Sequence, residues 1–175
     1  LTGANDDLVD GSQTSTVTFS VLDGSSDDDF DGVADQTVSV TTTDSDIAGF
    51  TVIESGGTTT VAEDGTTTDD FTVVLDAQPI SDVVISVTSL DTGEVTVSPA
   101  TLTFTSGNWD SSQTVTVTGV DDSLIDGSQT STITIAVVDE SSNDSFDSLT
   151  DQTVSVSTAD DDTAGFTITQ TDGSS

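Results

Sequence analysis

The chain contains the stretch Asp121-Asp122-Ser123-Leu124-Ile125-Asp126-Gly127-Ser128-Gln129-Thr130. A near copy, Asn5-Asp6-Asp7-Leu8-Val9-Asp10-Gly11-Ser12-Gln13-Thr14, stands about 116 residues earlier. The match continues downstream, because Asp35–Val40 is repeated letter for letter at Asp151–Val156. Self-similarity at one fixed period indicates a tandem array. The sequence therefore predicts one complete repeat at 47–162, the C-terminal part of a preceding repeat at 1–46, and the opening strand of a following repeat at 163–175.

Between the acidic stretches, Thr and Ser alternate with Val, Ile and Phe at period two, which is typical of strands with one buried face. Strands are expected over 15–22, 37–43, 48–54, 58–62, 71–75, 83–87, 95–97, 102–104, 113–119, 131–138 and 152–158. No helical period interrupts them. Nine of these ranges lie within 47–162, but 58–62 resumes the opening strand and 95–97 is a short edge piece. A complete repeat then holds about seven strands, which predicts an all-β, two-sheet sandwich. Phe30 and Val33 are expected to turn inward and anchor their loop, and Trp109 to plug one end of the core.

The charge balance is extreme. There are 33 Asp and Glu residues and no Lys, Arg, His or Cys, which gives a formal net charge of -33. Salt bridges between side chains are therefore impossible, as are disulfides. Nucleic acid and anionic membrane surfaces are poor partners because both require basic patches. No apolar run approaches the roughly 20 residues of a membrane span, so direct membrane insertion is not expected.

The same composition argues against an enzyme. Without His, Lys, Cys, Arg or Tyr, most acid–base and nucleophilic mechanisms lack their usual groups. A pair of carboxylates could cleave glycosides, but no sequence feature places two acids beside aromatic sugar platforms. A non-enzymatic function is therefore expected.

The order of several short motifs resembles a Calx-beta domain, and is most similar to the Calx-beta-like tandem repeats of large bacterial adhesin-type surface proteins. The residues that carry this resemblance are Phe50–Val52, Val61–Gly65, Leu102–Phe104 and Thr114–Asp122. The family implies an immunoglobulin-like antiparallel sandwich. In its calcium-regulated members it also implies calcium held by acidic loops at one end of the sandwich.

Carried over residue by residue, the resemblance assigns calcium ligands to Glu63, to Asp91 or Glu94, and to the pair Asp121 and Asp122. Ser123 stands where calcium-binding members often have a third acid. The acids of the hinges and of the copied stretch are further candidates, and the complete set is Glu63, Asp91, Glu94, Asp121, Asp122, Asp160, Asp162, Asp6, Asp7, Asp44 and Asp46. Calcium takes six to eight oxygen ligands, which such loops can supply. In the alternative interpretation these acids are solvated turn residues, and that interpretation is favoured for 27–31.

Two functions fit these observations. The first is an extender or spacer repeat of a long extracellular or cell-surface protein or filament, stiffened by calcium at the acidic ends of its repeats. The second is a calcium-dependent adhesive module that binds a carbohydrate or protein through its loops. The expected partners are neighbouring repeats. They either follow in the same polypeptide or belong to another chain that completes a half-sandwich by head-to-tail strand addition.

Overall fold

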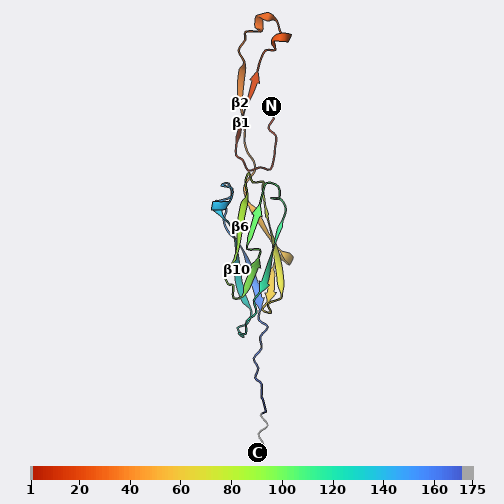
Figure 1. Ribbon diagram of the computed structural model, residues 1–175, viewed down its shortest axis with the longest axis vertical. Coiled ribbons are helices and arrows are strands. Elements are labelled where there is room, and N and C mark those ends of the chain that lie inside the picture. The colour runs from red at the N-terminus through yellow and green to blue at the C-terminus, as the bar shows by residue number, and fades with distance from the viewer. Residues whose placement is uncertain (1, 171–175) are drawn as a thin grey trace, which may run out of the picture.

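A computed structural model describes residues 2–170, and it is an immunoglobulin-like β-sandwich with a hairpin at one end (Figure 1). Within residues 50–159 nine strands form the sandwich. They are β3 (Phe50–Glu54), β4 (Thr59–Ala62), β5 (Thr68–Leu75), β6 (Val83–Ser89), β7 (Val95–Ser98), β8 (Thr101–Phe104), β9 (Gln113–Gly119), β10 (Gln129–Val137) and β11 (Gln152–Ala159). One sheet has the order β4-β11-β10-β6-β8 and the other β3-β5-β9-β7.

The expected count of about seven strands is too low because two strands change sheets. The opening strand breaks at Ser55–Gly57, where Gly56 and Gly57 adopt φ of 64° and 83°, a backbone conformation that glycine adopts without steric cost. β3 therefore pairs with β5, whereas β4 joins the other sheet and pairs in parallel with β11. β7 and β8 are divided between the sheets in the same way, on either side of Pro99. The remaining pairs in both sheets are antiparallel.

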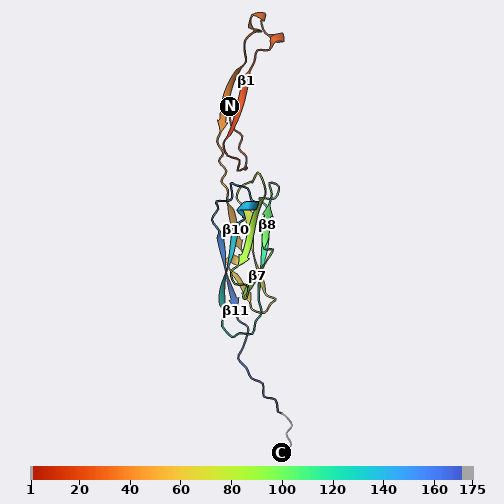
Figure 2. The ribbon, with the colours of Figure 1, turned by 60° about the vertical axis from the view of Figure 1, so that its left-hand side comes forward.

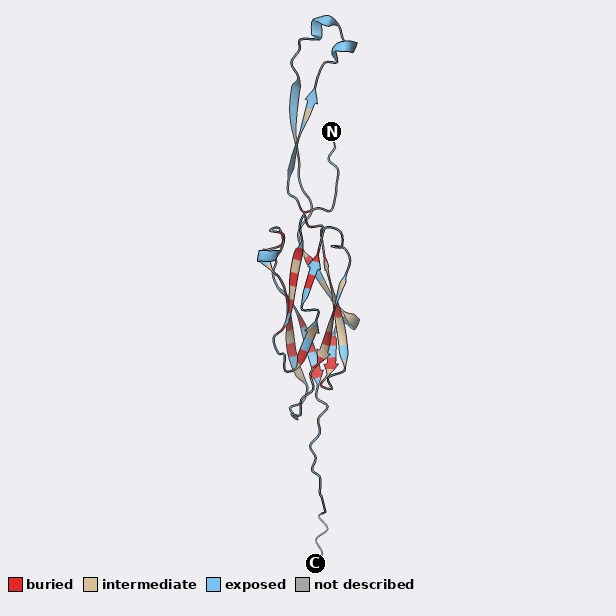
Figure 3. Ribbon diagram, in the orientation of Figure 1, coloured by how far each residue is buried: buried red, intermediate tan, exposed pale blue. Residues whose placement is uncertain are grey.

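Period-two alternation places the core as expected. On β5 the side chains of Phe71, Val73 and Leu75 are buried, and on β10 those of Ile133 and Ile135 are fully buried. Buried residues are confined almost entirely to the sandwich (Figure 3). Trp109 is partly buried against this core, which agrees with its expected position as a plug.

The segment 1–46, expected to be the C-terminal part of a preceding repeat, contains a two-stranded hairpin, β1 (Gln13–Phe19) and β2 (Gln36–Thr42). The hairpin pairs Gln13 with Thr42, and β10 and β11 pair their counterparts Gln129 and Thr158 in the same register. The hairpin and the C-terminal segment leave the sandwich at opposite ends of its long axis (Figures 1 and 2). The repeated sequence therefore builds the same strand pair twice.

The expected inward packing of Phe30 and Val33 is wrong in this structure, and the described part of 163–175 contains no strand. Phe30 is 59% and Val33 50% exposed, whereas Phe146, the counterpart of Phe30, is fully buried. The loop 23–35 of the hairpin contains two 3-10 turns, Asp23–Ser25 and Asp28–Phe30, but no second sheet lies over it among the described residues. The segment 163–170 forms no strand, and Phe166 is 89% exposed. The remainder of that expected strand, 171–175, lies outside the described residues. An apolar side chain becomes buried only where another layer packs on its element.

Helical structure in the described part of the chain is limited to 3-10 turns, of which Ser55–Gly57 and Asp139–Ser141 lie in the sandwich region. Across residues 2–170 no helix is long and apolar enough to cross a membrane.

The repeat supplies a matched pair of valines for testing the core. Val154 on β11 is 2% exposed, whereas its counterpart Val38 on β2 is 47% exposed. We expect Val154→Ala to lower the free energy of unfolding by roughly 1–3 kcal/mol, since it removes two buried methyl groups and leaves a cavity. Val38→Ala should cost less than about 0.5 kcal/mol. Denaturant unfolding followed by circular dichroism measures both, and equal costs would contradict the assigned packing.

Candidate metal centre

Three acidic side chains meet at the end of the sandwich from which the C-terminal segment leaves. Glu63 follows β4, Glu94 precedes β7 and Asp122 follows β9. Their backbones are fixed by neighbouring strand ends, because Glu63 N donates to Ala159 O at 2.9 Å and Val120 N donates to Glu94 O at 2.9 Å. One carboxylate oxygen from each of the three lies within 4.8 Å of the others. Within residues 2–170 this is the one group of three such side chains close enough to share an ion.

Gly119 lets these strand ends approach one another. It is the last residue of β9, and it is buried. A Cβ atom at this position would overlap the carbonyl of Ala62, the last residue of β4. Only a residue without a side chain permits this contact, so the loops that begin at Glu63 and at Asp121 leave the sandwich side by side.

Glu63 is the most deeply buried acid of the cluster. It is 1% exposed, and its Oε1 has no hydrogen-bond partner among the described residues. Burial raises the pKa of Glu63 to about 7, and the negative charges of Asp122, Glu94, Asp126 and Asp160 add to the effect. Burial also raises the pKa of Glu94, with further contributions from Asp126, Asp91 and Asp122. Glu94 Oε2 is likewise buried without a partner in the described structure.

The adjacent Asp64 is stabilised in the opposite way. Its carboxylate accepts hydrogen bonds from Thr66 N at 2.8 Å, from Thr67 N at 2.6 Å and from the Thr67 hydroxyl at 2.6 Å. The Thr67 hydroxyl and these amides hold the pKa of Asp64 well below its usual range. The chain thus supplies donors to carboxylates that form turns, but it supplies none to Glu63 Oε1 within the described residues. Grouped, partly dehydrated carboxylates without donors are the kind of oxygen ligands that hard divalent cations prefer.

The other candidates at this end lie outside the cluster of three. Asp91 is exposed and caps its own turn, with its Oδ1 accepting from Gly93 N at 3.1 Å. Asp121 is also exposed. Asp160 accepts from Gly127 N at 2.7 Å and from Asp162 N at 2.8 Å. Asp162 is partly buried, and its Oδ2 has no partner among residues 2–170.

The pKa of Asp162 is raised mainly by burial. The negative charges of Asp161, Asp160, Asp121 and Asp122 add to this effect. One acid outside the predicted set, Asp126, acts electrostatically on both Glu63 and Glu94. Asp126 lies inside the repeated stretch 121–130, and this position was the one sequence feature that could have pointed to it.

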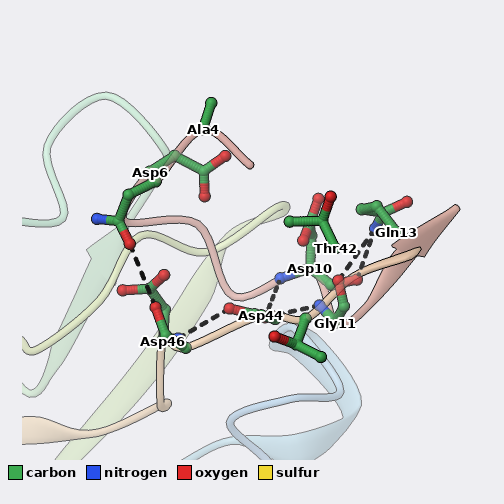
Figure 4. A pocket seen from close by; sticks show the side chains of 11 residues that line it. Ala4, Asp6, Asp10, Gly11, Gln13, Thr42, Asp44 and Asp46 are labelled. Atoms are coloured by element: carbon green, nitrogen blue, oxygen red, sulfur yellow. Dashed lines mark hydrogen bonds between the residues drawn. The ribbon is translucent and has the colours of Figure 1, made fainter. Parts of the chain in front are cut away.

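The remaining candidates lie at the joint between the hairpin and the sandwich. There, a pocket of about 210 Å³ is lined by acids that include Asp6, Asp44 and Asp46 (Figure 4). Asp44 accepts from Gly11 N at 2.7 Å and from Asp46 N at 2.8 Å, and the amides of Asp46 and Gly11 lower its pKa. The pKa of Asp46 is raised mainly by burial, and the negative charges of Asp44, Asp7 and Asp6 add to this effect. The predicted ligands at this joint are Asp6, Asp7, Asp44 and Asp46. No three of them lie close enough together to share an ion.

Comparison with known proteins leaves the family open. Neither the protein-family models nor the curated protein sequences gave a match. Among solved structures, domains 1–6 of the surface layer protein SbsC match with a TM-score of 0.46 and 22% identity, over 85% of this chain and 16% of that one. SbsC domains 4 and 5 match with a TM-score of 0.47 and 23% identity, over 84% of this chain and 58% of that one. The apo form of the Calx CBD1 domain matches with a TM-score of 0.41 and 16% identity, over 65% of this chain and 98% of that one.

This chain therefore spans less than two thirds of the SbsC chains that it matches. At these identities the likeness concerns the fold alone, and the Calx-beta resemblance stays a prediction.

The close approach at Gly119 gives the first test of this centre. We expect Gly119→Ala to destabilise the sandwich by roughly 1–3 kcal/mol, because the added methyl group would force the ends of β4 and β9 apart. The control is Gly107→Ala, where the nearest atom to the new Cβ would be 3.8 Å away. Equilibrium unfolding in urea measures both. A neutral Gly119→Ala would contradict the packing of these strand ends.

The raised pKa of Glu63 predicts an unusual pH dependence. The native state keeps the Glu63 proton up to about pH 7, whereas the unfolded chain releases it near 4.5. The native state then binds more protons between these values, so without divalent cations the free energy of unfolding should fall as the pH rises from about 5 to 8. Glu63→Gln should flatten this slope. Glu140→Gln, the same change at an exposed site, should leave it unchanged, and an equal slope in all three proteins would contradict the assignment.

Proposed function

We propose that this chain is part of an extender array of a cell-surface or extracellular protein, and that each repeat binds calcium through Glu63, Glu94 and Asp122. The observation that carries the proposal is the buried carboxylate of Glu63, whose Oε1 has no donor among residues 2–170 while two other acids approach it. A chain without cationic side chains can compensate this charge only with an ion, with water or by protonation.

Calcium fits this set of donors better than other common ions. Carboxylate oxygens are hard ligands, and neither His nor Cys is present in the chain to favour zinc or copper. Three carboxylates leave coordination positions for backbone carbonyls and water, which calcium accepts in flexible geometry. Extracellular modules bind calcium with dissociation constants of about 10⁻⁴–10⁻³ M, which agrees with an extracellular location.

The extender function rests on the direction of the chain. The hairpin of one repeat and the segment leading to the next leave the sandwich at opposite ends (Figure 1), so successive repeats would be strung end to end. The acids at each end repel one another when no ion is bound. A cation that neutralises the Glu63 end would reduce this repulsion beside the hinge 160–162 and stiffen the joint.

Calcium should stabilise the chain against unfolding. At about 10 mM calcium, a site with a dissociation constant of about 0.1–1 mM contributes about 1.4–2.7 kcal/mol. We expect the thermal midpoint to rise by several degrees relative to the protein in chelator. Glu63→Gln, Glu94→Gln and Asp122→Asn should each abolish most of the rise.

The control variant is Asp91→Asn, which changes an exposed acid outside the cluster and should keep the full response. Sodium chloride at matched ionic strength separates binding from screening of the net charge. The absence of a calcium-specific shift at about 10 mM, or an equal loss in Asp91→Asn, would refute the metal site.

A further inference from the structure

The segment that precedes the hairpin is docked on the sandwich. Val9 N donates to Gln78 O at 2.9 Å, and Gln78 N donates to Asp7 O at 2.8 Å, so 7–9 form a short parallel bridge with the turn after β5. Val9 is 9% exposed and belongs to the hydrophobic core of the sandwich. A loop of the preceding repeat thus contributes a side chain to the core of the next.

The surface that receives Val9 is apolar and rigid. Ala77 and Pro79 are buried on either side of Gln78. The Gln78 side-chain amide donates to Ser106 O at 2.7 Å, which ties this turn to the β8–β9 loop. The bridge itself is made by backbone groups and the apolar Val9 side chain, and the side chain of Asp7 stays exposed, so no carboxylate has to be dehydrated at the bridge.

The counterpart of this segment, 123–125, lies at the other end of the sandwich and docks on no other part of residues 2–170. Leu124 and Ile125, the counterparts of Leu8 and Val9, are 61% and 59% exposed. In a chain this polar, two adjacent exposed aliphatic residues in an acidic loop need an explanation.

The two loops also share a glycine with positive φ and two hydrogen bonds at equivalent positions. Gly11 N donates to Asp44 at 2.7 Å, and Gly127 N donates to Asp160 at 2.7 Å. The two glycines adopt φ of 72° and 75°. Leu8 N donates to Asp6 Oδ1 and Leu124 N to Asp122 Oδ1 in the same way. The exposed loop therefore already has these features of the segment that docks at the first joint.

We propose that the loop Asp121–Gly127 is an inter-repeat hook: it docks on the far end of another copy of this repeat, pairs with the residue equivalent to Gln78, and inserts Ile125 into that copy's core. The partner is a second copy of the same sandwich, because the acceptor seen in this structure is the sandwich of the complete repeat. The proposal is independent of the calcium site.

The hook gives each joint two attachments. The polypeptide at 46–49 is one, and a single covalent connection lets two bodies swivel. The hook is a second contact on a different loop, and two separated contacts restrict rotation about the connection. An array joined in this way resists bending and torsion at every repeat.

The test is a longer tandem in which residues 1–162 are followed by a second copy of 47–175, so that the period is preserved. Amide hydrogen exchange, measured in chelator, reports the second joint. We expect the Ile125 amide of the first copy and the Gln78 amide of the second copy to be protected at least about tenfold more than the exposed Ile125 amide of the original chain. The Val9 amide, which donates to Gln78 O at the first joint, serves as the internal standard for the protection of a docked segment.

Ile125→Asp in the first copy should remove this protection, whereas Ile53→Asp should keep it, since Ile53 is equally exposed on the flank of the sandwich. Protection that does not vary with protein concentration identifies docking within one chain, and protection that rises with concentration identifies docking between chains. An Ile125 amide that exchanges as fast in the tandem as in the original chain would overturn the proposal. Because no calcium is present, this result does not depend on the metal site.

Discussion

The structure is governed by the absence of any side-chain cation. Each of the 33 carboxylates must be stabilised by a backbone amide, a hydroxyl, water or an ion, or must be protonated. Asp64 and Asp69 receive amide and hydroxyl donors, and these donors lower the pKa of both. Glu63 is buried and Glu94 is partly buried instead, and each has an oxygen without a donor in the described structure. Asp147 and Asp162 also have an oxygen without a donor there, so the grouping of three acids within 4.8 Å distinguishes the candidate centre from the acidic surface around it.

Fold and site are connected through the ends of three strands. Because the opening strand changes sheets at Gly56 and Gly57, β4 runs beside β11 and delivers Glu63 to the same end of the sandwich as Asp160. The contact of Gly119 with Ala62 then brings in the loop that carries Asp122. The acids are held close by strand pairing and core packing, which supply the free energy that opposes their mutual repulsion.

The sequence predicted what depends on local pattern. Period-two alternation located the strands of the sandwich to within a few residues, and the repeat predicted that 1–46 carries the same two strands as the end of the complete repeat. Choosing between Asp91 and Glu94 depends on the turn before β7, where Asp91 caps the backbone and Glu94 points to the centre; alternation carries no information about that turn. The contribution of Asp126 and the exposure of Phe30 arise from contacts distant in sequence, or from the lack of a covering sheet, which local pattern does not encode.

The same loop carries a candidate ligand and the proposed hook, since Asp122 is only two residues before Leu124. A cation at Asp122 would fix the start of the loop, while the bond from Gly127 N to Asp160 already fixes its end. Ordering a loop before it docks reduces the conformational entropy lost on docking. Calcium and hook would therefore act in the same direction even though each can be measured alone: the ion reduces repulsion at the joint and orders the segment that spans it. In such an array the stiffness is determined at the joints, by a few residues of each repeat, and the surfaces of the sheets are free to remain acidic and well hydrated.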